Sequence, residues 1–355
     1  MKKYLALVMV LALAVCLFAG CGSTAEAPAA AAPEAAATGT FGGKDLNTET
    51  AKIAYIPIST AGVTNQMVKL AFDDALMPYN GNVIVDWFDC GYDTQTQITM
   101  VNDAVTQGYD LIMLESSDPV SLATPVAEAE AAGVPVITIN LNADAPHTLQ
   151  MTGVDYLAGK MAAETLINDF GADSAKKVIV IDCPAPMAAT NLQAPGFIDY
   201  MTANSNWELL ADQNVDNFSQ EGANTATRDL LTKYDDVDII FCIMDDLTTG
   251  VVQAVQAAGR DDGSIVIYGN MGNPSTWEMM TNGSGAIYGL NFLDYYGQYL
   301  IIMNQAIYYI ETGITAAKLG LDYTPETYVG CTPATPETAG LYRTLSRWDL
   351  AVAAN

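Results

Sequence analysis

The chain has 355 residues, half of them apolar, which is more than one ordinary core holds and suits two domains. Its 41 acidic and 14 basic side chains give a formal net charge of −27. Such a charge would be repelled by nucleic-acid phosphates and anionic lipid head groups, which argues against a nucleic-acid-binding protein. We interpret the acidity as that of a solvated surface.

The first twenty residues have the pattern of a secretory signal. Residues 1–3 are basic at two of three positions, and the apolar run 4–19 is too short and wrongly flanked for a stable membrane span. Small residues directly precede Cys21, which resembles the lipobox of bacterial lipoproteins, although Phe18 stands where leucine is usual. The resemblance implies a lipoprotein signal peptide over 1–20 and a lipidated Cys21. The alternative is an unlipidated secretory peptide.

Residues 21–49 consist mainly of Ala, Pro, Thr, Ser, Gly and Glu, with almost nothing large to bury. Such a segment cannot offset the entropy of ordering, so we predict a disordered linker. A flexible tether of about 25 residues spans roughly 25–30 Å. This reach suits a globule held at the outer face of the cell membrane by its lipid anchor.

From residue 51 onward, strand and helix patterns alternate. The first series predicts strands and helices in turn at 52–58, 64–77, 82–88, 94–108, 110–115, 120–132 and 133–142. Apolar residues fill nearly every position of the last of these, which is typical of a parallel strand buried on both faces. Asn140 stands near its carboxyl end, where ligands bind in open α/β sheets.

A second series continues the same alternation of strand and helix patterns. It predicts strands at 149–152, 177–182, 207–212, 237–243, 264–268 and 286–290, with helices at 158–170, 191–204, 222–233, 247–258 and 295–311. Alternating strands and helices require parallel sheets with right-handed crossovers. The expected fold is therefore α/β, with two doubly wound parallel-sheet lobes.

Several site classes are not supported by any motif. The chain has no GxGxxG after the first strand and no GxxxxGK[ST], which argues against Rossmann cofactor and NTPase sites. The cysteines after Cys21 are widely spaced without a CxxC, so no zinc pattern is present, and we expect Cys183 and Cys242 to be buried. His147 is the single histidine. We therefore expect no enzyme, no cofactor and no metal, although composition alone does not exclude paired carboxylates for glycoside hydrolysis.

Several short sequence motifs occur within this order of strands and helices. They are 132–138 (AGVPVIT), 154–160 (VDYLAGK), 195–197 (PGF), 245–246 (DD) and 257–259 (AAG). Together, over roughly residues 52–313, the chain resembles type I periplasmic binding proteins of the ribose- and galactose-binding branch.

The resemblance implies two lobes joined by a three-crossing hinge, with the ligand clamped between them. The N-terminal lobe would hold 50–152 plus 292–325, and the C-terminal lobe 153–291 plus 326–355. Members of that family supply solutes to ABC importers, so the implied partner is an ABC transporter permease.

The resemblance also implies ligand-binding positions. Where ribose receptors have aromatic residues after the first strand, this chain has Asn65 and Gln66, and where they have an Asp-Arg pair after the fourth strand it has Asn140 and Leu141. The remaining family positions for polar ligand contacts fall on Asn191, Met244, Asn270 or Met271, and Asn291. These replacements predict an uncharged pocket whose carboxamides both donate to and accept from ligand hydroxyls.

An aromatic ring is expected to cover the C–H face of such a ligand. The candidate rings are Trp87, Phe88, Phe218, Trp277 and Phe292, and ordinary core packing is the alternative for each. Turn chemistry is the alternative for Asn140, helix capping for Asp245 with Asp246, and a rim position for Glu115. The predicted ligand-binding set is Asn65, Gln66, Trp87, Phe88, Glu115, Asn140, Asn191, Asp245, Asn270 and Asn291.

The sequence therefore leads to the hypothesis of a monomeric, lipid-anchored, extracytoplasmic solute receptor. It would deliver a neutral, hydroxyl-rich small molecule, a sugar or polyol, to an ABC permease. The alternatives are a receptor for a nucleoside or signalling sugar derivative, and a sensor subunit that presents its ligand to a membrane kinase.

Overall fold

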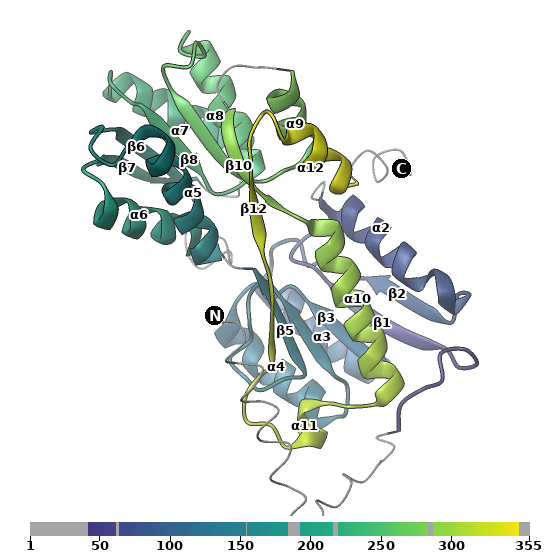
Figure 1. Ribbon diagram of the computed structural model, residues 1–355. Coiled ribbons are helices and arrows are strands. Elements are labelled where there is room, and N and C mark those ends of the chain that lie inside the picture. Colours follow the sequence, from purple (N-terminus) through teal and green to yellow (C-terminus); the bar gives the residue numbers. More distant parts are fainter. Residues whose placement is uncertain are drawn as a thin grey trace, which may run out of the picture. The chain divides into compact units, whose positions relative to one another are not determined.

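The computed structural model describes residues 42–61, 64–153, 155–183, 192–215, 219–282 and 287–347 (Figure 1). The predicted signal peptide, Cys21, most of the linker, Asn191 and Phe218 lie outside these residues. Within them, the strands form two six-stranded sheets. No helix of the described ranges is long and apolar enough to cross a membrane.

The first sheet has the strand order β11-β5-β4-β3-β1-β2, and all neighbouring strands pair in parallel. Its strands are β1 (Ala51–Ile56), β2 (Val83–Trp87), β3 (Leu111–Leu114), β4 (Val136–Ile139), β5 (Leu149–Gly153) and β11 (Glu326–Val329). The accompanying helices are α2 (Thr64–Leu76), η1 (Met77–Tyr79), α3 (Thr94–Thr106), α4 (Pro119–Ala131), α10 (Tyr295–Thr312) and α11 (Ala316–Leu319).

Helices cover both faces of this sheet. Ile53 and Tyr55 of β1 pack in a core with residues of α2 and α10, whereas Ala54 and Ile56 pack in a second core with residues of α3 and α4. The alternation follows from the two-residue period of a strand, which sends successive side chains to opposite faces. All four residues are fully buried, as the apolar run predicted for a parallel strand.

The second sheet has the order β12-β10-β9-β8-β6-β7. Its strands are β6 (Lys177–Asp182), β7 (Glu208–Asn214), β8 (Ile239–Cys242), β9 (Val266–Met271), β10 (Ile287–Leu293) and β12 (Cys331–Ala334). The helices of this lobe are α5 (Asp155–Phe170), α6 (Gln193–Asn204), α7 (Gln220–Lys233), α8 (Asp245–Ala257), α9 (Pro274–Thr281) and α12 (Ala339–Leu345). The prediction of two doubly wound α/β lobes is confirmed.

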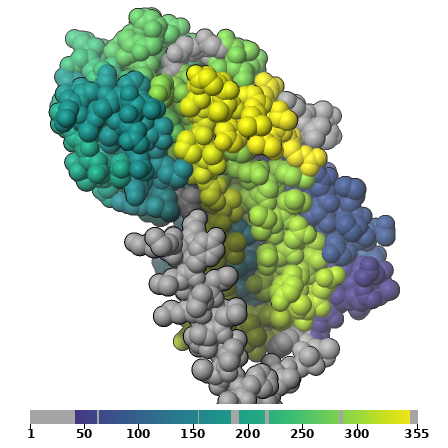
Figure 2. Space-filling model, in the orientation of Figure 1, coloured from purple at the N-terminus to yellow at the C-terminus, as the bar shows by residue number. Residues whose placement is uncertain are grey.

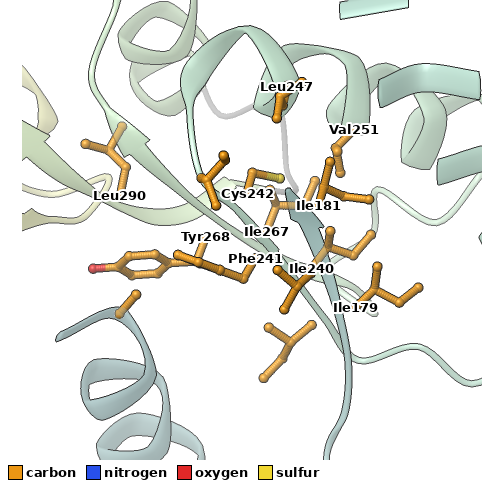
Figure 3. Close-up of a cluster of buried hydrophobic side chains, with 14 of the residues drawn as sticks. Ile179, Ile181, Ile240, Phe241, Cys242, Leu247, Val251, Ile267, Tyr268 and Leu290 are labelled. Carbon is orange, nitrogen blue, oxygen red and sulfur yellow. The ribbon is translucent and has the colours of Figure 1, made fainter. Parts of the chain in front are cut away.

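The core of the second lobe is built mainly from aliphatic side chains of its central strands. Figure 3 shows Ile179 and Ile181 of β6 beside Ile240 of β8, with Leu247 and Val251 on α8 above them. Phe197 of α6 and Phe241 of β8 stack with their ring centroids 4.3 Å apart. Cys183 and Cys242 are buried, as predicted.

The C-terminal part of the chain departs from the predicted parallel pattern. β12 pairs antiparallel with β10, and β11, predicted to lie in the second lobe, pairs instead with β5 of the first sheet. β10 also extends two residues past the predicted lobe boundary, to Leu293. The edge strands β11 and β12 were missed because only Ala334 of their eight residues is buried, so neither has an apolar run.

Three connections link the two sheets in the described part of the chain. The chain passes from the first sheet to the second after β5, returns after β10, and passes again at Gly330 between β11 and β12. The segment carrying α12, yellow in Figure 2, then packs on the second lobe, with Tyr342 beside Trp277 and Phe292. These two predicted candidate rings therefore serve as packing residues.

Candidate functional site

Asn140 follows the carboxyl end of β4 with a left-handed backbone, φ 64°. Its N–H donates to the carbonyl oxygen of Met151 at 2.8 Å, and the Thr152 hydroxyl donates to its carbonyl oxygen at 3.3 Å. These contacts engage only the backbone of the half-buried Asn140. The predicted turn chemistry is thus present, and the ligand role of the Asn140 carboxamide remains a prediction.

Glu115 ends β3 and anchors two tyrosines. Its Oε1 accepts hydrogen bonds from the hydroxyls of Tyr55, at 2.6 Å, and Tyr299, and its Oε2 accepts from the Ile58 N–H at 3.3 Å. Burial and the adjacent Glu115 raise the pKa of both tyrosines, so both hydroxyls remain donors. Glu115 therefore fixes α10 to the first sheet, a role that the sequence did not indicate.

Asn270 and Asn291, both predicted ligand contacts, bond to each other. Asn291 Nδ2 donates to Asn270 Oδ1 at 2.8 Å and to the Ala158 carbonyl at 2.8 Å, while its Oδ1 accepts from the Tyr268 hydroxyl at 3.2 Å. Asn270 Nδ2 donates to the Cys242 carbonyl at 3.2 Å. Both amides are buried and tie the central strands to α5, so their ligand role remains a prediction without new support.

The predicted rings Trp87 and Phe88 pack into opposite cores. Trp87 meets Tyr55 edge-on at 4.7 Å between ring centroids, in the core under α2 and α10. Phe88 lies 5.7 Å from Tyr109, in the core under α3 and α4. Tyr92, which follows β2 with φ 65°, is 54 % exposed. Consecutive residues of an extended chain point to opposite faces, so Trp87 and Phe88 could not have covered one ligand together.

Asn65 and Gln66 begin α2, just beyond the carboxyl end of β1. Asn65 Nδ2 donates to the carbonyl oxygen of Ser59 at 3.0 Å, which closes the turn between the strand and the helix. Gln66 differs, because its Oε1 is buried and has no hydrogen-bond partner among the described residues.

Gln66 is one of five residues with such an oxygen at the carboxyl ends of the strands. Within the described ranges, the partnerless buried oxygens after β1, β3, β4, β6 and β8 are Gln66 Oε1, Ser116 Oγ, Asn142 Oδ1, Gln193 Oε1 and Asp245 Oδ1. A buried polar atom without a partner destabilises a protein by about 1–3 kcal/mol. Other partnerless atoms lie elsewhere in the described ranges: Glu130 Oε2 at the amino end of β4, Thr227 Oγ1, Trp277 Nε1 and both amide atoms of Gln298. The five oxygens at the carboxyl ends stand where ligands bind in open α/β sheets, which makes that edge the candidate site.

Sequence reasoning missed Ser116, Asn142 and Gln193. The available signal was a polar side chain within three residues of a buried strand or at the first turn of the following helix. Such residues are common in turns, so the pattern alone does not separate binding from turn chemistry.

Carboxyl groups from several elements surround Tyr295, the first residue of α10. Burial raises the pKa of its hydroxyl, and the charges of Asp155, Glu115, Asp245 and Asp246 raise it further. Asp246 of the second lobe likewise adds to the raised pKa of Tyr92 in the first. The carboxyl ends of the two sheets are therefore within electrostatic reach of each other, and they are acidic where an uncharged pocket was predicted.

Asp245 is the most perturbed of these acids. It is 3 % exposed, and burial raises its pKa from 3.8 to about 8. Its Oδ2 accepts from the backbone N–H of Asn273, which follows the neighbouring strand β9. The N-cap of α8 is Met244, so the predicted capping alternative does not describe the bond that Asp245 makes. A carboxyl group that is protonated near neutral pH can donate to a ligand as well as accept.

Burial raises the pKa of the neighbouring acids as well. It brings the pKa of Asp182, at the end of β6, to about 6, with Asp212 adding to the shift. Asp155 has a raised pKa despite the hydrogen bond that Gln193 Nε2 donates to its Oδ1 at 2.9 Å. Across the described ranges, no three acidic, histidine or cysteine side chains converge closely enough to hold a metal ion.

Residues 53–312 match a family model described as a periplasmic binding protein domain. The ribose import binding protein of Bacillus subtilis (strain 168) is 27 % identical over 186 residues, which cover 52 % of this chain and 58 % of that protein. The D-allose-binding periplasmic protein of Escherichia coli (strain K12) is 26 % identical over 54 % of this chain and 63 % of its own length. The chain thus spans about three-fifths of the length of these curated relatives.

Solved structures show the same fold. A Caulobacter myo-inositol binding protein superposes with a TM-score of 0.73 at 18 % identity, covering 83 % of this chain and 97 % of that one. The periplasmic binding component of the arabinose ABC transporter from Shewanella sp. ANA-3 gives a TM-score of 0.73 at 16 % identity over 86 % of this chain and 99 % of that one. With most of the chain matched by the family model and both sheets in place, this protein belongs to the periplasmic binding protein family.

Proposed function

We propose that the protein is an extracytoplasmic solute receptor that clamps a hydroxyl-rich small molecule, a sugar or polyol, between its two lobes and delivers it to an ABC permease. The observation that carries the proposal is the set of partnerless acceptor oxygens at the carboxyl ends of strands in both sheets. Sugar hydroxyls supply the donors that these oxygens lack. The relatives named for ribose and allose point to the same ligand class.

The three crossings between the sheets support a clamp. Few residues connect the lobes at each crossing, so the lobes can close on a ligand by rotation at these short segments. Closure would exclude water from the carboxyl edges, where each hydrogen bond then becomes stronger.

We also propose that the protein catalyses no reaction. The matched relatives are named as a ribose import binding protein and a D-allose-binding periplasmic protein. The single histidine is engaged in structural bonds, since His147 Nε2 lies 2.8 Å from the Thr138 hydroxyl and Nδ1 lies 2.8 Å from the Ala145 carbonyl oxygen. Burial also lowers its pKa. These contacts leave it no role as a general base.

We also propose that Cys21 is lipidated, and the resemblance of residues 17–21 to a lipobox is the only support for this step. The lipid would hold the receptor, as a monomer, at the outer face of the cell membrane. Metabolic labelling with a fatty acid analogue tests this step: we expect label on the wild-type protein and none on Cys21→Ala.

Isothermal titration of ligand-free protein against pentoses, hexoses and polyols tests the receptor function. We expect one-to-one binding of at least one compound, weakened in Ser116→Ala because its buried hydroxyl belongs to the partnerless set. The matched control is Ser264→Ala, at a serine before β9 and outside that set, which should bind normally. Silence across the whole panel would refute the sugar or polyol assignment.

A further inference from the structure

The carboxyl edges of the two sheets carry acidic groups on several elements. Glu115 follows β3, Asp155 begins α5, and Asp245 and Asp246 begin α8, and all four act on the hydroxyl of Tyr295. Asp182 ends β6 and is also buried. These residues are far apart in the sequence, and the fold brings them to one region.

The described contacts of the basic side chains are with residues other than these acids. Lys160 packs over Tyr200, Lys233 packs over Tyr234, and Lys318 Nζ donates to the Gly313 carbonyl oxygen at 2.7 Å. The basic side chains at the amino ends of the strands bond or pack against residues that precede β3 or β8: Lys44 with Asp110, Lys52 with Tyr109, Lys176 with Asp238, Lys177 with Asp236, and Arg260 with Val237. Lys69 and Arg347 pair with Asp73 and Asp74 on α2. Residues 184–191, which follow β6 and lie outside the described ranges, contain no basic residue in their sequence.

An acidic cluster can be a solvated surface, but three buried groups within this one require a binding partner. Ser116, Gln193 and Asp245 are 1 %, 5 % and 3 % exposed, and each has an oxygen without a hydrogen-bond partner in the described protein. The bond from Gln193 Nε2 to Asp155 Oδ1 turns the amide so that its oxygen is the unpaired atom. Gln193 Oε1 can only accept a hydrogen bond, whereas the Ser116 hydroxyl and a protonated Asp245 carboxyl can also donate, so the need for a donor is strict at Gln193, beside Asp155. The ion pairs described above do not involve Glu115, Asp155 or Asp246.

We propose that the ligand carries an ammonium group, as an amino sugar or an amino polyol does. The inference rests on the proposed receptor function and specifies its substrate class. An ammonium group offers three donors and no acceptor, which suits Gln193 Oε1 and the acceptor lone pairs of Ser116 and Asp245, and its charge suits the ionised carboxylates of the region. A metal ion fits less well, because the described acidic side chains do not converge as a metal site does.

Titration with matched pairs tests the proposal. D-glucosamine is compared with D-glucose, D-galactosamine with D-galactose, and N-acetyl-D-glucosamine serves as the amino sugar whose charge is removed. We expect at least one amino sugar to bind about tenfold or more tightly than its neutral parent, with an affinity that falls as salt is added. A neutral parent that binds as tightly as its amino partner, or more tightly, would overturn the inference and leave the receptor function intact. Silence in every pair would overturn both.

A charge variant tests whether the acidic groups at the carboxyl ends of the strands cause the preference for amino sugars. Asp246 is exposed, so Asp246→Asn is expected to fold, and it should reduce the preference for the amino sugar several-fold. Asp261→Asn makes the same charge change at an exposed loop residue before β9, and it should leave the preference unchanged. Equal losses in the two variants would show a general effect of net charge and would overturn the proposed location.

Discussion

Replacing Asp245 by asparagine should remove a large part of the pH dependence of stability. Burial raises the pKa of this carboxyl from 3.8 to about 8, so the folded protein keeps a proton that the unfolded chain releases. The contribution of Asp245 to stability is therefore highest below about pH 4, falls as pH rises and levels off above pH 8. At 1.36 kcal/mol per pH unit, the free energy of unfolding falls by about 3–4 kcal/mol between pH 5 and pH 8 because of this one group.

Asparagine has nearly the same shape, can still accept from the Asn273 N–H, and has no proton to lose in this range. The gain in stability of Asp245→Asn over the wild type should thus be about 3–4 kcal/mol greater at pH 8 than at pH 5. Urea unfolding of refolded, ligand-free protein, followed through Trp207 and Trp277 of the second lobe, measures it. Asp261→Asn, at an exposed acid with the same charge change, should follow the wild type. The same pH dependence in Asp245→Asn and wild type would refute the assignment.

Three further substitutions test the core of the second lobe, the attachment of α10 to the first sheet, and the site. Phe197→Ala removes a fully buried ring from its stack with Phe241 and should lower the free energy of unfolding by about 3–5 kcal/mol in urea. Tyr299→Phe deletes one of the two tyrosine hydroxyls that donate to Glu115 and should lower the free energy of unfolding by about 1–3 kcal/mol. No change would show that the bond from Tyr55 alone is enough to hold Glu115. Asn140→Ala should weaken binding of the sugar found by titration by about 1–3 kcal/mol, and an unchanged affinity would remove Asn140 from the site.

Buried strands could be predicted from the sequence because their chemistry is local. The run at residues 177–182 predicts β6 with the bounds that the structure shows, since its apolar centre is buried on both faces. β11 and β12 were not predictable in this way. Their residues are mostly partly exposed, and their stability comes from pairing with β5 and β10, which are far away in the chain.

The site was predictable as an edge of each sheet but not as a set of contacts. Asn140 stands at a carboxyl end because a strand ends there, and that follows from its neighbours in sequence. The bond between Asn270 and Asn291 depends on the register of β9 against β10, which no local pattern encodes. The approach of Asp155 and Asp246 to Tyr295 depends in the same way on tertiary packing, so the acidity of the site emerged only with the fold.

Native mass spectrometry of the freshly purified protein, with chemical identification of any molecule that it retains, tests the central claim most directly. A receptor that encloses its ligand retains it during purification, so we predict one small, oxygen-rich molecule per chain that reacts with an amine-labelling reagent. A retained neutral sugar would contradict the ammonium inference and leave the receptor function intact, whereas a molecule that is apolar or carries a net negative charge would contradict the whole account.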